Sequence, residues 1–121
     1  MNDFIETSMM NSPTSQTFID PDGKVGRKGI LTLIDPTTGD SRFVWTVSNA
    51  KVLCFYQSQS FLTIVKLYRN SSLQVKDVYA TPCFLLASTK DISDGSILAC
   101  STTTQEKEVW LQTIYSNIKS N

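Results

Sequence analysis

The hydrophobic pattern of this chain changes once to a helical period, close to its C-terminal end. Trp110, Ile114 and Ile118 recur every four residues, so they lie on one stripe of a helix. Thr103 and Glu106 have the spacing of a capping box, in which each side chain satisfies a backbone N–H at the helix start. The sequence therefore predicts one amphipathic C-terminal helix whose stripe, with Trp110, belongs to the core.

Upstream of this helix the chain has the two-residue period and the turn residues of a β protein. Phe43, Trp45 and Val47 alternate with smaller residues, and we expect these three side chains to point inward, with Trp45 in the core. A chain of 121 residues with roughly seven strands and one helix is a single, mainly β domain. The other predicted strands lie near residues 26–34, 51–56, 61–68, 73–79, 83–87 and 97–101.

Residues 1–23 differ from the rest of the chain. They are polar, contain chain breakers and lack sustained periodicity, which predicts a flexible N-terminal arm followed by a domain over residues 24–121. The apolar pairs Phe4-Ile5 and Phe18-Ile19 are candidates for fastening the arm to the domain.

Charge and cysteine usage restrict the function. Eleven basic residues balance eleven acidic ones, so no net field attracts nucleic acid or an anionic membrane, and such binding requires a local patch. The sequence has neither a membrane span nor the apolar core of a signal peptide. Cys54, Cys83 and Cys100 lie in apolar runs without C-x-x-C spacing, which favours reduced core thiols over a disulfide or zinc site. We therefore predict a cytoplasmic protein.

An enzymatic function is not indicated. The chain has no histidine, the commonest general base and metal ligand. It also lacks a nucleophile-elbow motif, a phosphate-binding loop and an EF-hand loop. We predict no catalytic residues, no metal, no cofactor and no small-molecule substrate.

The arrangement of strands and helix resembles the pleckstrin homology (PH) superfold. Residues 98–101, followed by Glu106 and Trp110, are similar to the family's last strand and helix. Residues 28–31 resemble its first strand, and residues 45–56 its second and third. The resemblance implies a seven-stranded, partly open β-sandwich capped by the helix, which serves as a binding or targeting module in signalling and scaffold proteins.

PH domains that bind phosphoinositides use clustered basic residues on the first two strands, because a phosphorylated headgroup needs several charge-assisted hydrogen bonds. Here Lys24, Arg27 and Lys28 lie at the start of the first strand, and Arg27 is near the position of the family's lysine. Leu33 occupies the site where a second lysine is usual. The expected basic signature is therefore only partly present.

The second strand departs from the family pattern as well. The loop before it holds Asp35 and Asp40, which repel phosphate. Arg42 is the only basic candidate on this strand, and with Phe43 pointing inward it falls on the opposite face.

Lys24, Arg27 and Lys28 have three interpretations. They are ordinary solvated charges, part of an atypical anionic-lipid site together with Lys51 or Lys76, or contacts to an acidic protein partner.

Two function hypotheses follow. The favoured one is a protein–protein interaction module inside a larger cytosolic regulatory or scaffold protein, and the alternative is a peripheral membrane domain that binds phosphoinositides or other anionic lipids. A peptide-binding relative of the phosphotyrosine-binding or EVH1 kind is a more distant option.

Overall fold

The computed structural model describes residues 15–91 and 95–120. These residues form a mainly β fold with a C-terminal α-helix, as predicted, and one more strand than predicted. The elements are β1 (Gln16–Ile19), β2 (Val25–Ile34), β3 (Ser41–Ser48), β4 (Val52–Tyr56), β5 (Ile64–Arg69), the short 3-10 helix η1 (Asn70–Ser72), β6 (Leu73–Asp77), β7 (Cys83–Ser88), β8 (Ile97–Cys100) and α2 (Thr104–Lys119).

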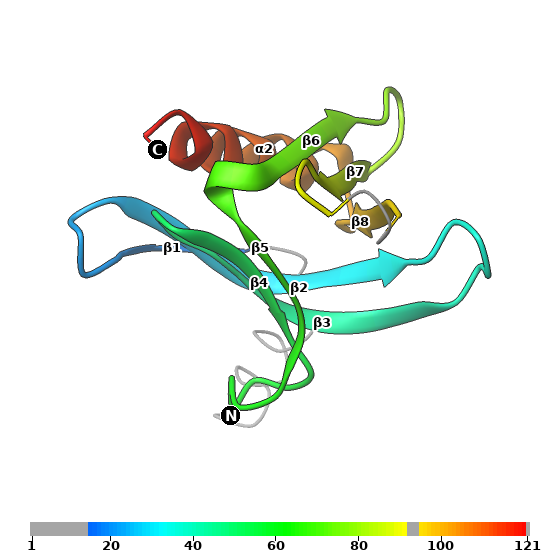
Figure 1. The fold of residues 1–121 in the computed structure, drawn as a ribbon, viewed down its shortest axis with the longest axis horizontal. Coiled ribbons are helices and arrows are strands. Elements are labelled where there is room, and N and C mark those ends of the chain that lie inside the picture. The colour runs from blue at the N-terminus through cyan, green and yellow to red at the C-terminus, as the bar shows by residue number, and fades with distance from the viewer. Residues whose placement is uncertain (1–14, 92–94, 121) are drawn as a thin grey trace, which may run out of the picture.

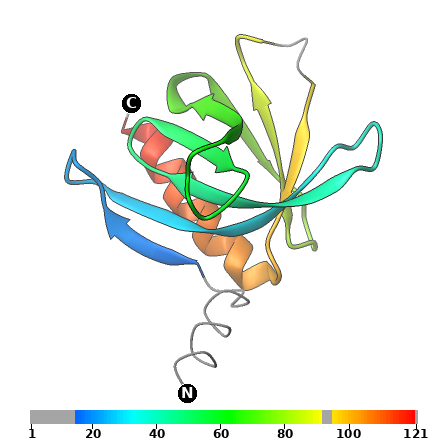
Figure 2. The same ribbon diagram turned by 90° about the horizontal axis from the view of Figure 1, so that it is seen from below.

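The strands form one antiparallel sheet in the order β5-β4-β3-β2-β8-β7-β6, and β1 pairs with β2. β2 is the longest described strand, and it joins the half of the sheet made of β3, β4 and β5 to the half made of β8, β7 and β6. Its whole length from Arg27 pairs with β3, while its last three residues, 32–34, also pair with β8. Figures 1 and 2 show the sheet curving around α2 without closing into a barrel, as in a PH-like sandwich.

The helix fills the core as its sequence predicts. Trp110 and Ile114 are each only 1% exposed, and Ile118 is partly buried against the same cluster. The Thr103 hydroxyl accepts a hydrogen bond from the Glu106 backbone N–H at 3.0 Å, which confirms the predicted helix start and one half of the capping box. The other half is not formed, because the Glu106 carboxylate accepts hydrogen bonds from Ser15 instead.

β3 faces the opposite way from the prediction. Val44 and Thr46 are fully buried, whereas Phe43 is 77% exposed. Trp45 and Val47 are half-buried and lie outside the core cluster. The prediction that Phe43, Trp45 and Val47 point inward is therefore wrong, and so is the placement of Trp45 in the structural core.

The close approach of α2 explains this orientation. The helix packs against β3, and Asn117 Nδ2 donates to Ser48 Oγ at 3.4 Å inside the protein. Small side chains such as Thr46 and Ser48 leave space for the helix, whereas the large residues of the other phase are placed outside.

β1 lies inside the segment that the sequence predicts to be an arm. Its Phe18 packs so closely on β2 that a Cβ at Gly26 would lie 2.5 Å from the phenyl ring, so this contact depends on glycine. Ile19, the other member of that apolar pair, is exposed. The domain boundary at residue 24 stays a prediction, and Phe4-Ile5 lies outside the described residues.

The cysteines also differ from the prediction. Cys83 and Cys100 are directly opposite each other on β7 and β8 and form a disulfide, so the prediction of three reduced thiols is wrong for this pair. Strand register brings the two together, and register is a tertiary property that spacing along the chain does not reveal. Cys54 is free and buried, and burial raises the pKa of its thiol.

Candidate binding site

The three basic residues at the start of β2 point in different directions. Lys24 is exposed in the turn between β1 and β2. Arg27 and Lys28 are consecutive on β2, so their side chains lie on opposite faces of the sheet. Lys28 is exposed on the outer face, while Arg27 faces α2. The structure therefore does not gather these three residues into one cluster.

Arg27 is engaged in the internal packing of the domain. Its Nε donates to Thr113 Oγ1 of α2 at 3.2 Å, and its NH1 donates to Ser15 Oγ at 2.7 Å. Ser15 in turn donates from its backbone N and its Oγ to one carboxylate oxygen of Glu106, at 2.7 and 2.9 Å. This network fastens the chain before β1 to the helix, so Arg27 has a structural partner on each side.

Lys24 and Lys51 do lie at the same end of the sheet. The carboxylate of Asp20 accepts hydrogen bonds from the backbone N–H groups of Lys24 and Ala50, both at 2.9 Å, and so joins the β1–β2 turn to the β3–β4 turn. Burial alone would raise the pKa of Asp20, but these bonds, a third from Asp22 and the charge of Lys24 outweigh it and lower the pKa. Lys24 and Lys51 remain exposed beside this joint.

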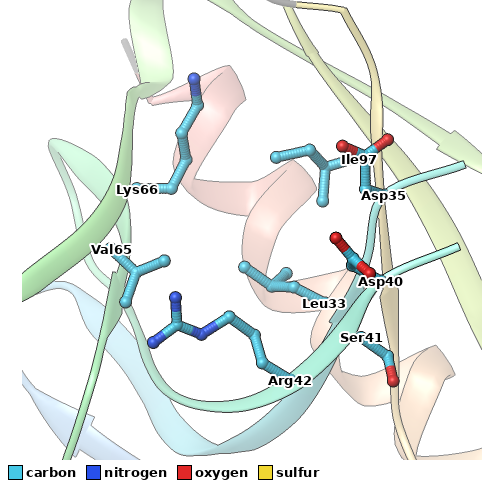
Figure 3. Close-up of a pocket in the computed structure, with 8 residues that line it drawn as sticks. All are labelled: Leu33, Asp35, Asp40, Ser41, Arg42, Val65, Lys66 and Ile97. Atoms are coloured by element: carbon cyan, nitrogen blue, oxygen red, sulfur yellow. The ribbon is translucent and has the colours of Figure 1, made fainter. Parts of the chain in front are cut away.

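Arg42 lies at the opposite end of β3 from Lys51. It is two residues from Val44 and shares its inward phase, so the prediction that Arg42 falls on the opposite face from the core is wrong. Together with Leu33 it lines a cavity of about 190 Å³ at the open end of the sheet (Figure 3). The remaining lining residues are Asp35, Asp40, Ser41, Val65, Lys66 and Ile97.

This cavity has mixed charge. Arg42 and Lys66 contribute two cations, and Asp35 and Asp40 contribute two carboxylates. In Figure 3 the Arg42 guanidinium and the Asp40 carboxylate lie on opposite sides of Leu33. A phosphate in the cavity would meet both signs at close range, which weakens the selectivity that a clustered basic site provides.

The outer face of β3, β4 and β5 carries a continuous group of large apolar side chains, which we call the outer patch. The register places Trp45 opposite Tyr56 and Tyr56 opposite Ile64, so the patch crosses three strands. Exposure is high for several members: 77% for Phe43, 84% for Leu62 and 51% for Ile64. The outer patch consists of Phe43, Trp45, Tyr56, Phe61, Leu62, Ile64 and Leu67.

The loop between β4 and β5 extends this patch and is internally braced. The Phe61 ring packs edge-on against Tyr56 and Trp45, with centroid separations of 5.1 and 6.3 Å. Gln57 N donates to Thr63 O at 2.8 Å and closes the loop. Phe61 has a φ of 56°, a costly conformation for a residue with a side chain. The loop thus holds Phe61 against the sheet while Leu62 projects into solvent.

The surroundings of the outer patch are basic. Between Ser41 and Lys76 the sequence contains no Asp or Glu. Arg69 and Lys51 are exposed within this stretch, and Lys28 is exposed on the neighbouring strand β2. An apolar surface bordered by positive charge is complementary to a partner that combines apolar and acidic groups.

Sequence reasoning missed the outer patch because it placed the same residues in the core. Either phase of β3 contains apolar residues, so periodicity shows that a strand exists without deciding which face is buried. The absence of acidic residues from Ser41 to Lys76 was a visible signal for a basic region, and it points to the half of the sheet that carries the patch.

Two classes of site find no support in the part of the chain that the structure describes. Residues 15–91 and 95–120 contain no group of three or more His, Cys, Asp or Glu side chains placed to hold a metal ion. Within the same residues no helix is both long and apolar enough to cross a membrane, and α2 has 16 residues.

Comparison with solved structures identifies the fold as that of PH domains. The DH/PH fragment of PDZRHOGEF in complex with human RhoA superposes with a TM-score of 0.68 at 12% identity, covering 78% of this chain and 28% of that chain. The DH/PH domains of p115-RhoGEF give 0.65 at 19% identity, covering 78% and 30%. The Slm1 PH domain in complex with phosphoserine gives 0.63 at 12% identity, covering 72% and 89%.

This chain therefore spans less than a third of the two DH/PH chains and corresponds to most of the Slm1 PH domain. No protein-family model matches the sequence. No curated protein matches it either.

Proposed function

We propose that this chain is a non-catalytic PH-type module of a larger regulatory or scaffold protein, and that it binds a protein partner through the outer patch. The exposure of Phe43 and Leu62 on one face, beside the half-exposed Trp45, is the observation that carries this proposal. Contiguous apolar surface of this kind marks interaction sites, because solvent exposure of large apolar side chains is otherwise unfavourable. Trp and Tyr are enriched among binding hot spots, and the patch contains one of each, Trp45 and Tyr56.

The comparison structures support the same role. The DH/PH fragment of PDZRHOGEF was solved in complex with RhoA, so a protein of which a PH domain is one part occurs in a protein–protein complex. The internal use of Arg27 and the mixed charge of the Arg42 cavity argue against a strong phosphate site as the main function.

The test compares three forms of the immobilised chain: the wild type, Phe43→Ser/Leu62→Ser, and the control Tyr79→Ser. Tyr79 is 90% exposed but lies on the loop between β6 and β7, outside the patch. Proteins of a cell lysate that the wild type retains are purified, and their affinity for each of the three forms is measured by calorimetry. We expect the double variant to bind at least about 30-fold more weakly, the loss typical of hot-spot residues. Equal affinity of the wild type and the double variant would overturn the proposal.

A second candidate is binding of anionic lipid headgroups at the membrane surface. Lys24 and Lys51 favour it, because both are exposed at one end of the sheet and Asp20 holds their two turns together. This site differs from the one predicted from Lys24, Arg27 and Lys28, since Arg27 faces α2.

Co-sedimentation with vesicles of phosphatidylcholine and phosphoinositide, over a salt series, tests this candidate. Binding that Lys24→Ala/Lys51→Ala abolishes, and that the exposed control Lys90→Ala retains, would support it; no sedimentation at low salt would exclude it. The cytoplasmic location stays a prediction, and the Cys83–Cys100 disulfide favours a compartment that is not strongly reducing.

A further inference from the structure

β5 forms an open edge of the sheet. It pairs with β4 on one side, and no other strand among the described residues pairs with its second side. It contains no proline. An edge strand of this kind presents backbone N–H and C=O groups that another extended chain can pair with.

The other end of the sheet, β6, is treated differently. The Tyr115 hydroxyl of α2 lies 3.5 Å from the Val75 carbonyl of β6, and the buried Lys107 ammonium donates to the Val78 carbonyl at 3.1 Å. Lys107 also forms an ion pair with Asp77 at 2.6 Å. Side chains of α2 therefore contact β6 and the residue that follows it. β5 lies instead on the half of the sheet that bears the outer patch.

The side chains of β5 continue the outer patch up to this open edge. Ile64 and Leu67 are 51% and 40% exposed, and Leu62 precedes them in the loop. Arg69 lies two residues after Leu67, so it is on the same outer face, and it is also exposed. A strand added beside β5 would place its own outward side chains next to Ile64, Leu67 and Arg69.

The charges near β5 define the chemistry of such a strand. Arg69 is exposed on its outer face, whereas Lys66 lines the cavity on the inner face, and the surrounding sequence from Ser41 to Lys76 has no Asp or Glu. Acidic side chains on an added strand would find opposite charge there, while a basic strand would be repelled.

We propose that β5 binds an extended segment of a protein partner as an additional strand, and that this segment alternates apolar with acidic residues. The inference rests on the proposed function, because the same outer patch receives the apolar side chains of the segment. It adds the geometry of the contact, which is main-chain pairing at the β5 edge, and the charge of the partner.

The experiment is a selection of randomised decapeptides, displayed on phage, against the immobilised chain. We expect enrichment of peptides that alternate Val, Ile or Leu with Asp or Glu. With a selected peptide bound, hydrogen exchange measured by NMR should slow at backbone amides of residues 64–69. Arg69→Glu should weaken binding about tenfold, because it replaces an attraction with a repulsion, and the exposed control Lys90→Glu should leave it unchanged.

Main-chain pairing has its own control. A selected peptide that is N-methylated at alternate residues retains its side chains but loses the donors for a sheet ladder, and it should fail to bind in at least one of the two methylation phases. If both methylated peptides bind as tightly as the unmodified one, or if the enriched peptides lack acidic residues, the inference is overturned while the proposed function stays intact.

A membrane is the other possible occupant of this surface. If the selection yields no peptide and the chain instead sediments with vesicles of phosphatidylcholine and phosphatidylserine in a manner lost in Arg69→Glu, the inference is wrong. The proposed function fails separately, if Phe43→Ser/Leu62→Ser retains its purified protein partner at full affinity.

Discussion

On the inner face of β3, Val44 and Thr46 are fully buried, whereas on its outer face Phe43 is 77% exposed and Trp45 is half-exposed. The larger and more apolar side chains are thus on the solvent-exposed face of the same strand. The inner face is limited by the distance to the helix, so it accepts small residues, while the outer face has no such limit. Large size and apolarity therefore do not mark the buried face of this strand, and the two faces should respond differently to mutation.

The largest expected effect is on the inner side, at Trp110. Trp110→Ala removes a side chain that is 1% exposed at the centre of the core, so the free energy of unfolding should fall by about 3–5 kcal/mol in urea titrations. The matched control is Trp45→Ala on the outer face, which should cost clearly less because Trp45 is already half-exposed. Similar losses for both variants would contradict the assignment of the two faces.

The next largest effect concerns the disulfide that joins β7 to β8. Reducing the Cys83–Cys100 disulfide opens a loop of 17 residues and should lower the free energy of unfolding by about 3 kcal/mol, chiefly by freeing the unfolded chain. Unfolding is measured with and without a phosphine reductant. The Cys83→Ser/Cys100→Ser variant should be insensitive to the reductant, and an equal response in both proteins would rule out the disulfide as the cause.

The sequence predicted the secondary structure well and the faces poorly, for physical reasons. The Thr103 cap and the spacing of Trp110, Ile114 and Ile118 are local signals, and they placed the helix correctly. The orientation of β3 depends on its packing against α2, where Asn117 contacts Ser48, and this tertiary contact leaves no trace in a two-residue period.

The site was harder to predict than the fold. Lys24, Arg27 and Lys28 are close in sequence, but alternation along β2 separates Arg27 from Lys28, and Arg27 bonds with Ser15 and Thr113. The pairing of Cys83 with Cys100 likewise depends on strand register. The PH-like fold was predictable because the order of the strands and of the final helix follows directly from local sequence patterns.

A smaller effect with the opposite sign is expected at Thr46. Its hydroxyl is fully buried and has no hydrogen-bond partner among the described residues. Thr46→Val removes this polar group while keeping the shape, so it should raise the free energy of unfolding by about 1 kcal/mol. Urea titration measures the change, and Thr32→Val on the outer phase of β2 is the control, expected to be close to neutral. A loss of stability in Thr46→Val would show that the hydroxyl is bonded in solution.

A further effect is confined to acid and concerns Asp20, at the joint between two turns. Because its pKa is lowered in the folded protein, the carboxylate contributes stability above its unfolded pKa of 3.8, and this contribution is lost as the pH falls through the folded pKa. The free energy of unfolding should therefore fall more steeply below about pH 4 in the wild type than in Asp20→Asn. Asp22→Asn, whose side chain is exposed, should follow the wild type. Identical pH profiles for the wild type and Asp20→Asn would contradict this role.

The smallest effect on stability is expected on the outer face. Phe43→Ser/Leu62→Ser replaces side chains that are 77% and 84% exposed, so the free energy of unfolding should change by no more than about 0.5 kcal/mol. Urea titration of this variant beside Trp110→Ala measures both faces on one scale. A loss of several kcal/mol in the double variant would mean that the outer patch packs against part of the same chain. A neutral result leaves the two faces with separate roles, because residues that add nothing to folding are then free to be used for binding.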